Sequence, residues 1–193
     1  LMIEACEARF RDHPPHWAFR VGDARALHFL PAGSFDLVLF SCQGLDTLPH
    51  EDRLLALREM RRVCAPGGFF VFTSNNLQAV RSWSRFQWSR YPPRLADEVR
   101  RQVALRRLNP SLKQLDRQEY AELYDGTFSF QLRSYHIRPR RQVTQLVAAG
   151  FDVLHVLDTR GAEVPEKAWD TSTERIICYV ARAGAEPGGG GEH

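Results

Sequence analysis

The sequence has no long apolar run. Its longest candidates, residues 35–40 and 69–72, have the length of a strand, whereas a membrane-spanning helix needs roughly 18 apolar residues or more. It also has no basic leader, because residues 1–6 mix apolar with acidic side chains and further charges follow at once. We therefore expect no membrane segment and no secretory signal in these 193 residues, and we expect a cytoplasmic protein.

Cysteine is scarce. The four cysteines lie far apart and show none of the short spacings of metal ligands; they are Cys6, Cys42, Cys64 and Cys178. Each has apolar neighbours, so we expect all four to be small buried hydrophobes in a reducing compartment. The pattern argues against a disulfide-stapled domain and predicts no metal site.

Basic and acidic residues are nearly equal in number over the whole sequence, but they are unevenly distributed along it. The formal net charge is only +3, yet ten basic residues oppose three acidic ones between Arg81 and Arg117. The rest of the chain is therefore acidic on balance. Such asymmetry can mark an anionic partner, although a solvated helical face is the more common origin of the pattern.

Apolar spacing predicts alternating strands and helices. Helices are expected where apolar residues recur every three or four positions, over residues 1–11, 49–64, 94–108 and 138–149. Strands are expected over apolar runs, at residues 17–21, 35–40, 69–73, 151–157 and 175–181. This alternation is typical of an α/β fold with a parallel sheet covered on both faces. The last two strands leave no room for a crossover helix, so we expect an antiparallel pair at one edge.

Two segments stand apart from this alternation. Residues 77–133 are rich in aromatic and basic side chains, and we expect them to form a mostly helical insert in a domain of residues 1–183. Its aromatic residues could line a binding wall or simply pack as the core of the insert. They are Trp83, Phe86, Trp88 and Tyr91. Residues 184–193 are rich in glycine and are expected to be a disordered tail.

Small or polar residues follow three of the expected strands directly. They are Gly22-Asp23-Ala24-Arg25, Ser41-Cys42-Gln43-Gly44-Leu45-Asp46 and Ser74-Asn75-Asn76. In an open α/β sheet, ligands bind beyond the carboxyl ends of the strands. A structural turn could account for one such edge, but three together favour a ligand cleft.

The order of four motifs resembles one enzyme family. The motifs are Gly22-Asp23-Ala24, Ser34-Phe35-Asp36-Leu37-Val38, residues 57–63 and residues 66–72, with Tyr135-His136-Ile137-Arg138-Pro139 further on. In this order and spacing they are similar to the class I methyltransferases that use S-adenosylmethionine, over roughly residues 1–181. The resemblance implies a doubly wound, Rossmann-like sheet in which residues 77–133 form a helical lid over the methyl acceptor.

The resemblance also implies S-adenosylmethionine as the cofactor. Asp23 would accept a hydrogen bond from the adenine amino group, and the backbone N–H of Ala24 would reach a ring nitrogen. Ser41, Cys42 and Gln43 would line the cofactor near its methionine end. Two structural alternatives stay open: Asp23 could cap its own turn, and Cys42 could be core filler.

Methyl transfer needs little beyond in-line placement of the reacting atoms, and a base helps only where the acceptor must lose a proton. Asp46 and His50 are the candidate bases, although a histidine at a helix start is more often a surface or capping residue. The candidate acceptor-binding residues are Asn75, Asn76, Trp83, Tyr135 and His136. The two asparagines could instead merely close a turn.

One feature of the family is missing from the sequence. The family holds the cofactor with a Gly-x-Gly-x-Gly turn, yet no Gly-x-Gly precedes Trp17, and the only glycine run is residues 188–191. We therefore expect a sheet without its first two strands, and a site completed only by an upstream glycine-rich segment. In the family those strands separate the third strand, residues 17–21, from the fourth, residues 35–40. Without them, residues 17–21 should pair directly with residues 35–40 or with a second chain, as in a homodimer.

The sequence thus predicts methyl transfer to a small-molecule acceptor. One alternative is a non-catalytic, methyltransferase-like module that binds a partner protein. Another is an RNA-modifying or RNA-binding protein, because the insert interleaves aromatic and basic residues. A nucleic-acid partner is the less favoured of these, and no membrane partner is expected.

Overall fold

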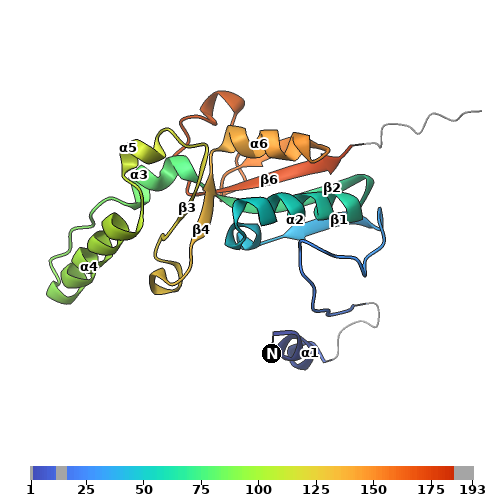
Figure 1. Cartoon of the computed structure of the whole chain (residues 1–193), viewed down its shortest axis with the longest axis horizontal. Coiled ribbons are helices and arrows are strands. Elements are labelled where there is room, and N and C mark those ends of the chain that lie inside the picture. Colours follow the sequence, from blue (N-terminus) through green and yellow to red (C-terminus); the bar gives the residue numbers. More distant parts are fainter. Residues whose placement is uncertain (1, 12–16, 185–193) are drawn as a thin grey trace, which may run out of the picture.

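The computed structural model describes residues 2–11 and 17–184, in which six strands form one sheet with helices beside it (Figure 1). The strands are β1 (Phe35–Phe40), β2 (Cys64–Asn76), β3 (Tyr120–Leu123), β4 (Ser134–Ile137), β5 (Phe151–Leu157) and β6 (Ile176–Ala183). The α-helices are α1 (Met2–Arg9), α2 (His50–Val63), α3 (Val80–Trp83), α4 (Pro92–Leu108), α5 (Leu112–Leu115) and α6 (Pro139–Ala148). Short 3₁₀ helices occur at Gly44–Thr47, Leu77–Ala79, Thr127–Phe130 and Glu166–Ala168.

The central strand of the sheet is β2. On one side it pairs antiparallel with β6, which pairs antiparallel with β5. On its other side β2 pairs parallel with β1 up to Phe72, and then parallel with β4 at Asn75 and Asn76. The hairpin of β3 and β4 therefore extends the sheet beyond the carboxyl end of β1. This hairpin and the lid helices α3–α5 lie together at the carboxyl edge (Figure 1).

One face of the sheet is covered by α2 and α6. Strand side chains alternate between faces, so Phe70 and Phe72 of β2 point to the covered face, where they pack with Tyr179 of β6 and Phe151 of β5. The helices add Leu57, Met60 and Leu146 to the same core. Burial of this apolar surface is the main stabilising contribution to the fold.

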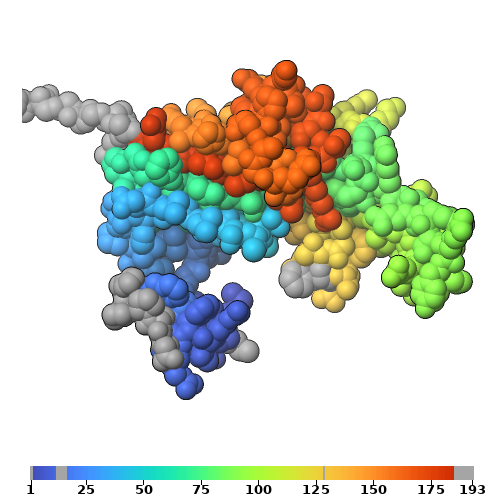
Figure 2. Space-filling view, turned by 180° about the vertical axis from the view of Figure 1, so that it is seen from behind, coloured from blue at the N-terminus to red at the C-terminus, as the bar shows by residue number. Residues whose placement is uncertain are grey.

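The opposite face carries apolar side chains that no described helix covers. Leu37 is 58% exposed, Leu39 is 64% exposed, and Phe69 beside them is 42% exposed. Helix α1 buries none of its residues, and it stands apart from the sheet in both views (Figures 1 and 2). We expected helices on both faces of the sheet. In the described chain, helices cover only one face.

Most of the long elements agree with the prediction from sequence. The bounds of β1 and β5 match residue for residue, and those of α2 and α6 agree within one residue at each end. The antiparallel pair expected at the end of the chain is confirmed as β5 and β6. By the hydropathy of the described helices, none is both long and apolar enough to cross a membrane.

The prediction of a strand at residues 17–21 is wrong. These residues have no regular structure, and they pair neither with β1 nor with any other described strand. A strand is stable only when its backbone pairs with a neighbouring strand, and no described strand lies in register with residues 17–21.

Strand β2 is longer than the predicted residues 69–73. It begins at Cys64 and includes Pro66-Gly67-Gly68. A Cβ atom on Gly68 would lie 3.0 Å from the carbonyl oxygens of Phe35 and Asp36. Glycine at this position therefore lets the two backbones approach closely enough for β1 and β2 to pair.

Three other expectations need correction or fall outside the structure. The insert of residues 77–133 contains α3, α4, α5 and two short 3₁₀ helices, but it also contains irregular segments and β3, a strand too short for its alternating pattern to stand out. Of the cysteines predicted to be buried, Cys64 is buried, whereas Cys42 is exposed and Cys6 and Cys178 are only partly covered. The predicted disordered tail, residues 184–193, lies outside the described residues apart from Gly184.

Candidate functional site

The turn after β1 is strained. Cys42 has a φ of 55° and Gln43 a φ of 51°, so two consecutive non-glycine residues adopt the left-handed conformation, which costs about 1–2 kcal/mol per residue. The turn is held by Thr73 of β2, whose hydroxyl oxygen accepts hydrogen bonds from the backbone N–H and the side-chain amide of Gln43, both at 3.1 Å. Strain of this kind concentrates at functional sites, and here it points the exposed Ser41 and Cys42 away from the core.

A buried ion pair lies directly behind this turn. Asp46 is 2% exposed and Arg53 of α2 is fully buried, with 2.6 Å between Oδ1 and Nη1. The Asp46 carboxylate also accepts from the Ser74 hydroxyl at 2.8 Å and from the Asn75 backbone N–H at 2.6 Å. Burial raises the pKa of Asp46, while the Arg53 charge and the N–H of Asn75 oppose that rise. With every oxygen occupied by protein groups, the geometry favours a structural role for Asp46 over the predicted role as a base.

The guanidinium of Arg53 connects the carboxyl edge to the helix layer. Its Nη2 donates to Gln142 of α6 at 2.6 Å and to Ser74 at 3.1 Å, and its Cζ lies 4.7 Å from the ring centre of Tyr135. The sequence reasoning missed this residue. A signal was present, because Arg53 shares a helical face with Leu57 and Met60, four and seven residues on.

His50 begins α2 and faces the β3–β4 hairpin. Its ring stacks on Tyr120 with 3.9 Å between ring centres, and its Nδ1 lies 2.8 Å from the hydroxyl of Tyr135. Burial is the main reason why the pKa of His50 is lowered, and the charges of Arg141 and Arg53 contribute. The residue is therefore neutral near pH 7, and its Nε2 makes no hydrogen bond within the described chain.

Three of the predicted acceptor-binding residues are buried and make contacts within the protein. Tyr135 is buried, which raises its pKa to about 12. Asn76 uses its amide to cap the Leu77–Ala79 turn and to bind the carbonyls of Ser172 and Glu174. Asn75 is also buried, and its amide lies 3.4 Å from the carbonyl of Tyr135.

His136 is fully buried beside Asp125. Its Nε2 lies 3.7 Å from Asp125 Oδ2. Although burial opposes the change, the contacts of Asp125 with His136 and Thr127 lower the pKa of Asp125. The ring of His136 also contacts Trp83 of the lid, with 5.8 Å between centres. Trp83 lines a cavity of about 530 Å³ within the lid.

Asp23 and Ala24 border a cleft that reaches the turn after β1. The cleft has a volume of about 430 Å³, and Phe40 and Gly44 line its other side. Gly44 lies against Phe40, since a Cβ at Gly44 would lie 2.4 Å from the ring. The structure thus brings Asp23 and Ala24 close to the end of β1, whereas Ser41, Cys42 and Gln43 adjoin this cleft without lining it.

Arg25 holds the Asp23 carboxylate. Its backbone N–H and guanidinium donate to both oxygens at 2.7–3.1 Å, and these hydrogen bonds lower the pKa of Asp23 to about 2. The guanidinium also binds Asp52 of α2 at 2.7 Å. The turn-capping alternative for Asp23 is therefore seen, and the capped carboxylate is fixed in its ionised form at the mouth of the cleft.

Comparison with known proteins is informative at the level of family and fold. Residues 1–68 match a family described as methyltransferase domain. A search of curated proteins finds no match.

Structural alignments with solved structures of similar fold extend over nearly the whole chain. An S-adenosylmethionine dependent methyltransferase from Mesorhizobium loti has a TM-score of 0.59 at 21% identity, over 93% of this chain and 76% of that one. A second, from Clostridium acetobutylicum, has a TM-score of 0.61 at 12% identity, over 95% and 72%. The glycopeptide N-methyltransferase MtfA, complexed with (S)-adenosyl-L-methionine, has a TM-score of 0.51 at 17% identity, over 92% and 71%. Identities this low establish a shared fold.

Proposed function

We propose that this chain, a class I methyltransferase by its fold and by the family match over residues 1–68, binds S-adenosylmethionine and transfers its methyl group to a small-molecule acceptor. One observation carries the proposal: a strained, non-glycine turn after β1 adjoins a cleft whose far side is Asp23 and Ala24. In α/β sheets this edge is where nucleotide-like ligands bind.

The adenine half of the cofactor fits the residues present. Asp23 offers an ionised carboxylate to an exocyclic amino group. The backbone N–H of Ala24 donates to no protein acceptor in the described chain, so it remains available to a ring nitrogen. Together they supply one acceptor and one donor at adjacent positions, which matches the edge of an adenine ring.

The methionine half of the cofactor would lie against the turn of Ser41, Cys42 and Gln43. Bound S-adenosylmethionine would supply a methyl group on a positively charged sulfur that leaves as a neutral thioether. The chain's contribution is to place the acceptor in line with that methyl group and to exclude water. Because Thr73 fixes Gln43 from behind, the turn is already ordered for this task.

Of the two candidate bases, the geometry supports His50 better than Asp46. His50 is neutral near pH 7 because its pKa is lowered, and its Nε2 is not used by the protein. It would therefore take a proton only from an acceptor that must lose one. The stack with Tyr120 and the contact with the Tyr135 hydroxyl hold the ring in place.

The proposal is tested by calorimetric titration with S-adenosylhomocysteine, the demethylated cofactor. We expect the chain to bind it weakly, because the glycine turn expected upstream is missing from these residues, and we expect Asp23→Ala to weaken binding further, on the order of tenfold, the cost of one lost hydrogen bond to a charged group. Arg25→Ala keeps the carboxylate and should weaken binding less. The glycine turn of the family has no counterpart in the sequence, so the affinity also reports how much of the site these residues carry.

Asp97→Ala is the matched control, because Asp97 is an exposed carboxylate on α4 that likewise pairs with an arginine. It should leave the affinity unchanged. Equal affinities of wild type and Asp23→Ala would show that the adenine lies elsewhere. Absence of binding to wild type would contradict methyl transfer by this chain and favour the non-catalytic module.

A further inference from the structure

The lid contains a half-open cavity that shares no lining residue with the cofactor cleft. It lies between α3, α4 and α5 and has a volume of about 530 Å³, within the 300–1,000 Å³ typical of small-molecule pockets. Its walls are largely apolar. The apolar lining residues include Val80, Trp83, Leu105, Leu115 and Leu123.

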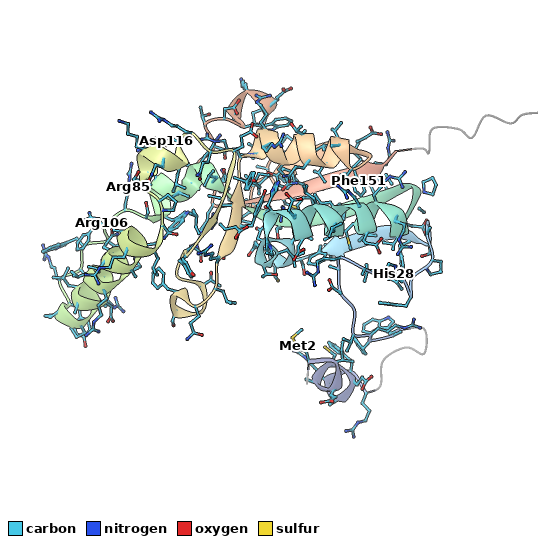
Figure 3. All side chains as sticks on the ribbon, viewed as in Figure 1. Met2, His28, Arg85, Arg106, Asp116 and Phe151 are labelled. Atoms are coloured by element: carbon cyan, nitrogen blue, oxygen red, sulfur yellow. The ribbon has the colours of Figure 1, made fainter. Side chains whose placement is uncertain are left out.

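The charges around this cavity have one sign. Its lining includes three arginines and, among the described residues, no acidic side chain. Arg81 is neutralised by Asp116. Arg85, which follows α3, and Arg106 of α4 pair with no acidic group in the described chain, and both are exposed (Figure 3). Two free guanidinium groups at an apolar cavity are suited to an anionic group such as a carboxylate or a phosphate.

The uncharged polar side chains of the lining are largely occupied. Both polar atoms of the Asn109 side chain bind the backbone of Tyr124, and the Gln102 amide donates to Ser84 and Glu98. The Trp83 indole N–H, by contrast, is buried without an acceptor in the described chain. The hydrogen-bonding capacity left at this cavity therefore includes the indole N–H and the guanidinium groups of Arg85 and Arg106, which are all donors, so a well-matched ligand brings acceptors.

Trp83 also connects the cavity to the sheet. Its ring contacts His136 of β4, and His136 lies in register with Asn75 at the carboxyl end of β2. A molecule bound in the lid would thus lie next to the edge at which the cofactor is proposed to bind.

We propose that the lid cavity binds a small molecule with an apolar body and one anionic group, a carboxylate or a phosphate, held by Arg85 and Arg106. This molecule is the methyl acceptor, an assignment that rests on the proposed function. The apolar body lies against Trp83 and the leucines, and the anionic group lies at the arginine-lined mouth.

The test uses three probes of one shape: 2-naphthoate, 2-naphthyl phosphate and the neutral 2-naphthamide. Calorimetry on the full chain should show that at least one anion binds, and that the amide binds on the order of tenfold more weakly. Arg85→Gln and Arg106→Gln should each reduce anion affinity by a similar factor and leave the affinity for the amide unchanged. The stronger of the two anions identifies the acceptor as an acid or as a phosphate ester.

Arg107→Gln is the matched control. Arg107 neighbours Arg106 on α4, is also exposed, pairs with no acidic group among the described residues, and does not line the cavity. Its variant carries the same change in net charge and should bind the anions like wild type. The proposal is overturned if Arg107→Gln weakens anion binding as much as Arg106→Gln does, because that result would indicate a diffuse basic surface suited to RNA. It is also overturned if the amide binds as tightly as both anions, or if neither anion binds.

Titration of the same samples with S-adenosylhomocysteine separates this inference from the proposed function. Anion binding that depends on Arg85 and Arg106, without cofactor binding, would contradict methyl transfer and leave the cavity as a binding site. Cofactor binding without anion binding would support methyl transfer and overturn the role of the cavity.

Discussion

The polar residues behind the carboxyl edge serve two different purposes. Asp46, Asn76 and Tyr135 are fully engaged in contacts within the protein, and Arg53 of α2 joins Asp46 and Tyr135 to α6. Asp23 and His50 remain partly accessible and keep capacity for a ligand. A buried ion pair contributes little net stability compared with apolar residues, yet it is costly to break, because the remaining charge has no partner. The network around Arg53 therefore fixes the geometry of the turn after β1 more than it stabilises the fold.

Replacement of Arg53 by methionine should lower the free energy of unfolding by about 3–5 kcal/mol, because Asp46 is left charged and buried. Urea denaturation measures the change. Arg58→Met, on the exposed side of the same helix, is the control and should change stability by less than about 0.5 kcal/mol. The double variant Arg53→Met with Asp46→Asn should lose less stability than the sum of the two single variants. Strictly additive losses would show that the two side chains do not act as a pair.

At the scale of elements, β1 is the least protected strand. Its partner on one side is β2, and its other edge pairs with no described strand. Two of its leucines also lie on the uncovered face of the sheet. An exposed edge next to an apolar face is a template for pairing with another chain. We therefore expect the described part of the chain to associate with a second copy through β1.

The double variant Leu37→Ser with Leu39→Ser should reduce this association. The weight-average mass from sedimentation at micromolar concentrations is the measurement, and it should fall towards that of the 22.2 kDa monomer. Leu55→Ser, which replaces a partly exposed leucine on α2, is the control and should leave association unchanged. A monomeric wild type, or equal effects of both changes, would refute association through β1.

The whole molecule consists of a sheet body and a lid with separate cores. The main core lies between the sheet and the helices α2 and α6. The second, smaller core contains Leu77, Val80, Leu115, Ala121 and Leu123. The lid projects beyond the carboxyl edge (Figure 1), and ring contacts of Trp83 with His136 and Arg175 help to join it to the body. A unit with its own small core can open without unfolding the rest of the molecule.

Amide hydrogen exchange should therefore be faster in α4 than in β2 and β6. Val99, Val103 and Leu108 of α4 are all substantially exposed, so little apolar burial opposes local opening. Mass-spectrometric exchange on the native chain measures the difference, with α2 as the reference helix. Protection of α4 equal to that of α2 would contradict a lid that opens independently. Binding of the naphthyl anion to the lid cavity should slow exchange in α4 and leave α2 unchanged.

Sequence alone was sufficient where local pattern and tertiary context agree. The apolar spacing of α2 and the runs of β1 and β5 predicted their bounds, because these segments bury the face that their own period defines. The short hairpin of β3 and β4 escaped prediction, since four residues of alternation are not a distinctive signal. Asp23 and Ala24 border a cleft at the end of β1, whereas their role in cofactor binding, which came from the resemblance to a family, stays a prediction.

The sequence by itself determined the α/β class, most of the long elements and the small polar residues that follow the strands, because each depends on spacing along the chain. Only the tertiary structure decided which polar residues remain available for chemistry. Asp46 and Asp23 look alike in sequence, as single carboxylates after a strand. Arg53 of α2 and Asn75 of β2 donate hydrogen bonds to Asp46 in the interior. Arg25 instead holds Asp23 beside an open cleft. Partners distant along the chain determine which carboxylate is buried, and neither periodicity nor motif encodes those contacts.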